Sequence, residues 1–168
     1  MDKLPKYLLF LSAFTVAILG GLAFYYTSQS YFADSLIYDD DNGIAIHGYD
    51  PVAYFTEEKA VYGDPLYEVS WAGSRWRFAS PENRDLFADD PNKFAPQYGG
   101  YEPVMIVKGY SSPTDPLIWS MRDGLLYLHH NEQTKAYWLE NFRDNRIQAD
   151  ASWPRIRSQL QYIQSQSE

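Results

Sequence analysis

Hydrophobic positions gather first in an uncharged, mostly apolar run, residues 8–26, near the N-terminus. About 20 apolar residues at about 1.5 Å rise each cover a bilayer core of about 30 Å, so the run predicts one transmembrane helix. Lys3 and Lys6 precede the run, whereas the first basic residue after it is Lys59. The positive-inside bias then places residues 1–7 in the cytoplasm and the rest of the chain across the membrane.

A cleaved secretory signal is the alternative to an uncleaved anchor, and cleavage would release the exported domain. Such signals have a shorter apolar stretch of about 7–15 residues that is followed by small residues. This run ends instead in Phe24, Tyr25 and Tyr26, which favours the anchor. Residues 27–38 then predict a tether that spans at most roughly 40 Å when extended, and residues 39–168 predict one folded domain close to the membrane.

Alternating apolar and polar positions predict two β-hairpins in this domain. In residues 67–79 the alternation continues on both sides of a small-residue bend. Residues 117–121 and 125–129 flank Arg122-Asp123-Gly124, and Asp-Gly between apolar runs is a strong two-residue turn signal. These segments therefore predict antiparallel pairs.

Cap and proline signals predict four helices. Ser80-Pro81 and Asp90-Pro91 each combine a capping side chain with proline in the first turn, so we expect a helix to about Asp89 and a short one after it. Asn131 is positioned to cap a third helix. Ser152-Trp153-Pro154 starts a last amphipathic helix.

Residues 101–107 have strand character, with Pro103 indicating an edge or an irregular start. Short strands interleaved with helices lack the long βαβ rhythm of a parallel sheet. The sequence therefore predicts an α+β domain with a small mixed or antiparallel sheet and flanking short helices, preceded by one N-terminal transmembrane helix.

Composition narrows the classes of function. The net charge is −8, which disfavours a nucleic-acid partner because like charges repel the phosphate backbone. The chain has no cysteine, which excludes disulfides, thiolate metal sites and thiol nucleophiles. Fifteen Tyr, five Trp and nine Phe predict a core and a surface rich in aromatic rings.

Four segments of the domain form a recognisable series. They are GIAIHGYDPVAYFTEEKAVYGDP (residues 43–65), WRFASPENRDLFADDPNKFAPQYGGY (residues 76–101), DGLLYLHHN (residues 123–131) and ADASWPRI (residues 149–156). In this order, and over most of the domain, they resemble the YHS-domain family of bacteria. The resemblance implies a compact α+β domain, typically extracytoplasmic, whose molecular role is poorly defined.

The chain departs from this family's patterns at five positions. Small cysteine-bearing relatives that bind metal would place thiolates at the positions of Ala53, Ala79 and Asn83. Alanine cannot replace a thiolate ligand and asparagine replaces it poorly, so the metal function is not implied here. The larger subfamily often has Cys and Asn at the positions of Glu102 and His129.

The first candidate site is a tyrosine-rich concavity that binds a small molecule or a partner protein. Aromatic rings give a large contact area at low entropy cost, which suits recognition. The Gly48–Pro51 turn also has a purely structural interpretation, with Asp50 bonded to its own backbone. The residues expected to line this ligand site are Tyr49, Asp50, Tyr54, Tyr98, Tyr101 and Tyr127.

The second candidate is a zinc or copper site built from carboxylate and imidazole groups. Glu102 and one of the histidines His129 and His130 would converge with His47 or Asp50 if residues 101–107 and 125–129 pair in one sheet. Neighbouring residues of a strand point to opposite faces, which opposes joint ligation by His129 and His130.

An enzyme is the third alternative, but the usual catalytic motifs are missing. The sequence has no Gly-x-Ser-x-Gly, no His-Glu-x-x-His and no phosphate-binding or dinucleotide glycine pattern. Ser80 is better explained as a helix cap than as a nucleophile. The preferred interpretation is a non-catalytic YHS-type binding module without a cofactor, anchored in the cytoplasmic membrane with its domain in the periplasm.

Overall fold

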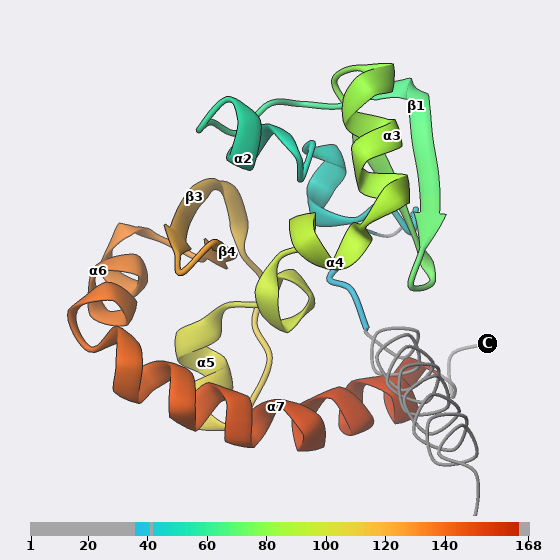
Figure 1. Cartoon of the computed structure of the whole chain (residues 1–168). Coiled ribbons are helices and arrows are strands. Elements are labelled where there is room, and N and C mark those ends of the chain that lie inside the picture. The colour runs from blue at the N-terminus through green and yellow to red at the C-terminus, as the bar shows by residue number, and fades with distance from the viewer. Residues whose placement is uncertain (1–35, 41, 165–168) are drawn as a thin grey trace, which may run out of the picture. The chain divides into compact units, whose positions relative to one another are not determined.

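The computed structural model describes residues 36–40 and 42–164, which belong to the second of the chain's two compact units, Ser35–Glu168. This part is α+β, as expected. It contains two separate two-stranded antiparallel sheets and a set of short helices, shown in Figure 1. The expected transmembrane helix (residues 8–26), the cytoplasmic segment and most of the tether lie outside the described residues.

The first hairpin joins β1 (Asp64–Trp71) to β2 (Ser74–Phe78), which confirms the prediction for residues 67–79. Ala72 and Gly73 form its turn with positive φ values of 52° and 84°, a conformation that suits the twist of a two-residue hairpin. Trp76 and Phe78 on β2 are fully buried, because alternation points both side chains to the core.

Two helices follow β2 where the cap signals placed them. The Ser80 hydroxyl accepts a hydrogen bond from the Asn83 N–H at 3.1 Å, and α3 (Pro81–Asp89) begins there. The Asp90 carboxylate caps α4 (Pro91–Phe94) in the same way. In both helices proline occupies the first turn, where its missing N–H has no helical partner to lose.

The second hairpin joins β3 (Asp115–Arg122) to β4 (Leu125–His129), again as predicted. Its two faces belong to different hydrophobic clusters. Leu126 and Leu128 enter the first cluster with Trp76 and Phe87, whereas Tyr127 enters the second cluster with Trp138. The hairpin therefore separates two small cores.

The prediction of a strand over residues 101–107 is wrong. Pro103–Lys108 forms helix α5, and the Glu102 carboxylate caps it by accepting a hydrogen bond from the Val104 N–H at 3.1 Å. Pro103 is the first helical residue and not an edge-strand residue. Glu followed by Pro thus begins a helix here in the same way as Ser80-Pro81.

The start of the last helix was also predicted wrongly. After α6 (Glu132–Glu140), which Asn131 caps as expected, α7 runs without interruption over Phe142–Gln164 with Pro154 inside it. Pro154 is exposed, and apolar residues on both sides of it, Ala149 and Ile156, are buried in the second cluster. Continuous burial of this face outweighs the backbone hydrogen bond that proline removes.

Three further short elements complete the fold: η1 (Ile46–Gly48), α2 (Ala53–Thr56) and η2 (Gln97–Gly100). Gly99 has φ +64°, and a Cβ atom there would lie 2.0 Å from the Leu36 carbonyl oxygen. The glycine pair thus lets the segment at residues 36–37 pass against η2, which is packing between backbones. Within residues 36–40 and 42–164, no helix has the length and apolarity needed to cross a membrane.

Candidate functional site

Asp50 is a buried structural carboxylate. It has no exposed surface, and its oxygens accept hydrogen bonds from the Val52 N–H at 2.8 Å and the Ala53 N–H at 3.3 Å, which starts α2. The Ala79 N–H at 2.8 Å and the Asn83 side-chain amide at 2.7 Å bind its other oxygen. The carboxylate therefore joins α2 to the segment between β2 and α3.

Three of these four donors stand at the positions where the metal-binding relatives would carry cysteine. Ala53, Ala79 and Asn83 are far apart in sequence, and all three donate to the one Asp50 carboxylate. The place where thiolates would meet is thus occupied by a hydrogen-bonded carboxylate.

The six residues expected to line a concavity lie in different surroundings. Tyr54 is buried in the first cluster and donates to the Pro116 carbonyl at 2.8 Å. Tyr49 is half-buried against Tyr62, with ring centroids 5.4 Å apart. Tyr101 is half-buried between Tyr38 and Trp153. The structure brings Tyr98 and Tyr127 together in the second cluster, but it does not gather all six around one cavity.

Of the expected metal ligands, Glu102 and His129 meet. Both are fully buried, and Glu102 Oε1 lies 3.7 Å from His129 Nδ1. His130 is exposed, as expected for the neighbour of a buried residue, and only its backbone N–H reaches Glu102. His47 packs instead against the ring of Tyr38. In the described part of the chain, no three His, Cys, Asp or Glu side chains are grouped so that they could hold a metal ion.

Glu102 is held as an ionised carboxylate. Burial alone would raise its pKa, but His129, the His130 N–H, the Thr134 hydroxyl and the Val104 N–H together lower the pKa below the ordinary value. The Thr134 hydroxyl donates at 2.8 Å. Glu102 thus connects the start of α5 with the end of β4 and the start of α6.

His129 extends this network to Ser120, which sequence reasoning missed. Ser120 Oγ lies 2.8 Å from His129 Nε2, so serine, imidazole and carboxylate follow one another as in hydrolases that use a serine nucleophile. Ser120 is only 7% exposed and His129 is fully buried. The network joins β3, β4 and α5.

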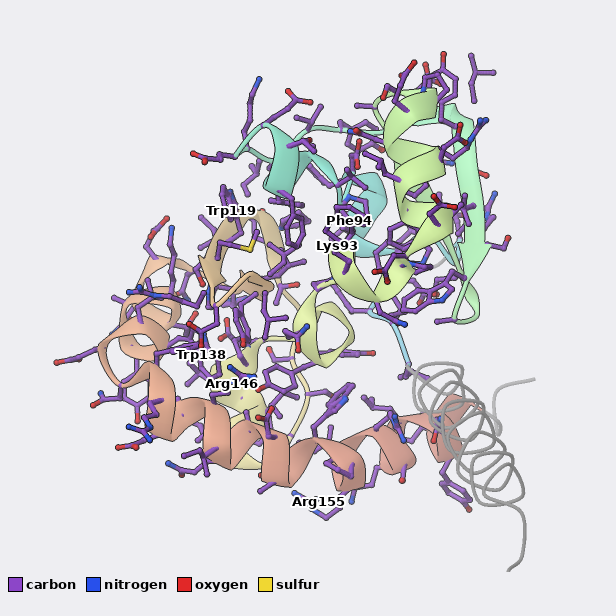
Figure 2. The ribbon with its side chains drawn as sticks, in the orientation of Figure 1. Lys93, Phe94, Trp119, Trp138, Arg146 and Arg155 are labelled. Carbon is purple, nitrogen blue, oxygen red and sulfur yellow. The ribbon has the colours of Figure 1, made fainter. Side chains whose placement is uncertain are left out.

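A pocket with mixed charges lies between the β3–β4 turn and the start of α7, and we call it the Arg146 pocket. Its volume is about 490 Å³, within the range of small-molecule sites. Arg146 Nη1 lies 3.3 Å from Asp123 Oδ2, and Arg146 Nε lies 3.7 Å from Asp150 Oδ2. Figure 2 labels Arg146 on α7. The lining residues are Asp123, Phe142, Arg143, Arg146, Ile147 and Asp150.

Two of the expected ligand-binding tyrosines lie beneath this pocket. The Tyr98 hydroxyl donates to Asp150 Oδ1 at 2.8 Å. Tyr127 is 1% exposed and its hydroxyl is buried without a hydrogen-bond partner. Burial raises the pKa of Tyr127 to about 12, with opposing effects of Arg146, which lowers it, and Asp150 and Asp123, which raise it. The hydroxyl is thus neutral and lies in the field of three pocket residues.

The charged lining of the pocket was not predicted from the sequence, although a signal was present. Arg143, Arg146, Ile147 and Asp150 are spaced i, i+3, i+4 and i+7, which places them on one face of a helix. The signal was hidden because α7 was expected to start only at Ser152. Asp123 was assigned to the hairpin turn, which is where it lies.

Comparisons of the chain with family models, with curated proteins and with solved structures found no match. The resemblance to the YHS-domain family therefore stays a prediction.

Proposed function

We propose that this protein is a non-catalytic binding module of YHS type, tethered to the outer face of the cytoplasmic membrane, that takes a small molecule in the Arg146 pocket. The observation that carries the proposal is a pocket of ligand size, about 490 Å³, in which Arg146 stands between two partly exposed carboxylates, close to the buried and unpartnered Tyr127 hydroxyl. An unsatisfied buried polar group costs about 1–3 kcal/mol, so this hydroxyl calls for an explanation, as do the buried Trp138 Nε1 and His129 Nδ1.

The burial of the other polar groups supports recognition over chemistry. Asp50 and Glu102, the two fully buried carboxylates, are each occupied by several donors that hold elements of the fold together. A general acid or base needs a free position toward a substrate. The pocket charges, by contrast, are partly exposed and accessible to a ligand.

The test is a pocket-filling substitution with a matched control. Ile147 lines the pocket and is 61% exposed, so Ile147→Trp would fill the pocket without disturbing the core. Ile163 is 64% exposed on the same helix outside the pocket, and Ile163→Trp serves as the control. The full chain is screened against small metabolites for an increase in melting temperature.

We expect compounds that stabilise the wild type and Ile163→Trp to have no effect on Ile147→Trp. Stabilisation that persists in Ile147→Trp would contradict the assignment of the pocket.

Because the anchor is a separate part of the proposal, a C-terminal alkaline phosphatase fusion tests it. The fusion should be active, since that enzyme folds only outside the cytoplasm, and an inactive fusion in sound membranes would contradict the topology.

The Ser120–His129–Glu102 network favours one second candidate, a serine hydrolase. A fluorophosphonate probe followed by intact-mass measurement distinguishes the two functions. An adduct that Ser120→Ala abolishes would establish the hydrolase, whereas a binding module gives none. The low exposure of Ser120 favours the absence of an adduct.

A further inference from the structure

The Arg146 pocket has a defined pattern of charges, and this pattern bears on the class of ligand. Arg146 stands between two carboxylates, Asp123 at 3.3 Å and Asp150 at 3.7 Å. Arg143 also lines the pocket and makes no ion pair with any carboxylate in the described part of the chain. Two guanidinium groups and two carboxylates therefore face the pocket, and their formal charges cancel.

The hydrogen-bonding groups left over in the pocket are of both kinds. Arg143 has guanidinium donors to offer, whereas the Tyr127 hydroxyl is buried and is not among the lining groups. Asp123 Oδ1 has no hydrogen-bond donor among the described residues, whereas Asp150 uses one oxygen for Tyr98 and the other for Arg146. A bound molecule would thus meet a free acceptor and a free donor at the same time.

One wall of the pocket is apolar. The Phe142 ring packs at 5.7 Å from both Tyr127 and Trp138, and Ile147 continues the wall with a largely exposed side chain. A ligand with an apolar group would cover Ile147 and release its water.

We propose, resting on the function proposed above, that the ligand of the Arg146 pocket is a small zwitterion with an apolar group, of the class of free α-amino acids. Its carboxylate is bound by Arg143, its ammonium group by Asp123, and its side chain by Phe142 and Ile147. Because the pocket is neutral overall, a ligand of one sign would leave an uncompensated like-charge contact, whereas a zwitterion pairs both signs.

The experiment measures binding of three probes to the full chain by calorimetry. Phenylalanine carries both charges, phenylalaninamide lacks the carboxylate, and N-acetylphenylalanine lacks the ammonium group. We expect phenylalanine to bind, and each modified form to bind about tenfold or more weakly, since every lost charge removes charge-assisted hydrogen bonds.

Two variants assign the contacts. Arg143→Gln should weaken phenylalanine about tenfold and leave phenylalaninamide unchanged, because that probe has no carboxylate to lose. Asp123→Asn should weaken phenylalanine and leave N-acetylphenylalanine unchanged. Arg155→Gln is the matched control: Arg155 lies further along α7, outside the pocket, and binds the Gly109 carbonyl at 3.0 Å.

Failure of the inference and failure of the proposed function give different results. The inference is overturned if phenylalanine does not bind, or if it binds no better than the two modified probes. The proposed function stands in that event if compounds of another charge class stabilise the wild type but not Ile147→Trp. The proposed function is contradicted as well if every compound that stabilises the wild type stabilises Ile147→Trp equally.

Discussion

Replacement of Glu102 by glutamine keeps the size of the side chain nearly unchanged, but it should destabilise the domain markedly. The carboxylate accepts hydrogen bonds from the Val104 N–H at 3.1 Å, the Thr134 hydroxyl at 2.8 Å and the His130 N–H. In Glu102→Gln one oxygen becomes an amide that cannot accept, so at least one buried donor loses its partner and the remaining bonds lose their charge assistance. An unsatisfied donor costs about 1–3 kcal/mol, and we expect a total loss of about 2–4 kcal/mol.

The same contacts predict how stability depends on pH. Because the pKa of Glu102 is lowered in the folded state, its contribution is complete above the unfolded-state pKa of about 4.3. It is lost as the pH falls through the folded-state value, since the folded protein must then take up a proton that it binds weakly. Glu102→Gln has no such proton, so its stability should fall less steeply than that of the wild type in this acid range.

Urea unfolding of the full chain, followed by tryptophan fluorescence between pH 3 and 7, measures both effects. Glu132→Gln is the matched control, because Glu132 is also at a helix start but 70% exposed in a surface pair with Lys135. That pair should contribute less than about 1 kcal/mol. A Glu102→Gln variant within about 0.5 kcal/mol of the Glu132→Gln control, or one with the acid dependence of the wild type, would refute the reasoning.

Three further predictions concern the other groups described above. Asp50→Ala removes the acceptor of four hydrogen bonds and should cost about 3–5 kcal/mol; urea unfolding measures it, and a cost below about 1 kcal/mol would contradict the structural role. Gly99→Ala places a Cβ atom 2.0 Å from the Leu36 oxygen at φ +64° and should cost at least about 1–3 kcal/mol; an unchanged melting temperature would show that the segment at residues 36–37 does not pack there. Elemental analysis of untagged protein should find neither zinc nor copper in stoichiometric amount, whereas a bound ion lost in Glu102→Ala would support metal handling.

Turn and cap chemistry made part of the fold predictable. Asp-Gly at residues 123–124 takes positive φ values of 53° and 73° at low cost, which fixes the β3–β4 register. Ser80 and Asp90 cap α3 and α4 through their own side chains. These signals depend on a few neighbouring residues, so they are readable without knowledge of the tertiary structure.

Elements that depend on distant contacts were not predictable in this way. The Glu102 carboxylate that caps α5 also accepts hydrogen bonds from the His130 N–H, 28 positions away, and from the Thr134 hydroxyl, 32 positions away. Pro154 is tolerated within α7 because Ala149 and Ile156 stay buried against α5 and the second hairpin. In α7 tertiary packing outweighs the local signal that proline gives, whereas Pro103 agrees with a helix start whose Glu102 cap was not recognised.

The candidate sites also differ in how far the sequence alone could predict them. The sequence predicted that Glu102 would meet either His129 or His130, and it placed Tyr98 and Tyr127 in a set of six ligand-binding residues. The structure brings Glu102 to His129 and Tyr98 to Tyr127, without the other members of either set. The helical spacing around Arg146 went unused, because its partners Asp123 and Asp150 come from a turn and from a helix whose start was misplaced. Reading α7 as starting at residue 142 would have placed Arg143, Arg146 and Asp150 on one face.

The Asp50 network joins α2 to the start of α3 without any thiolate. A cluster of cysteines around a metal would join α2 to the start of α3 by coordination bonds, and here one carboxylate joins the same segments by hydrogen bonds from Ala53, Ala79 and Asn83. Because the carboxylate is fully buried and fully occupied, this place is closed to a ligand. Under the function proposed above, ligand binding therefore falls to a different part of the domain, and the Arg146 pocket has the partly exposed charges that the Asp50 network lacks.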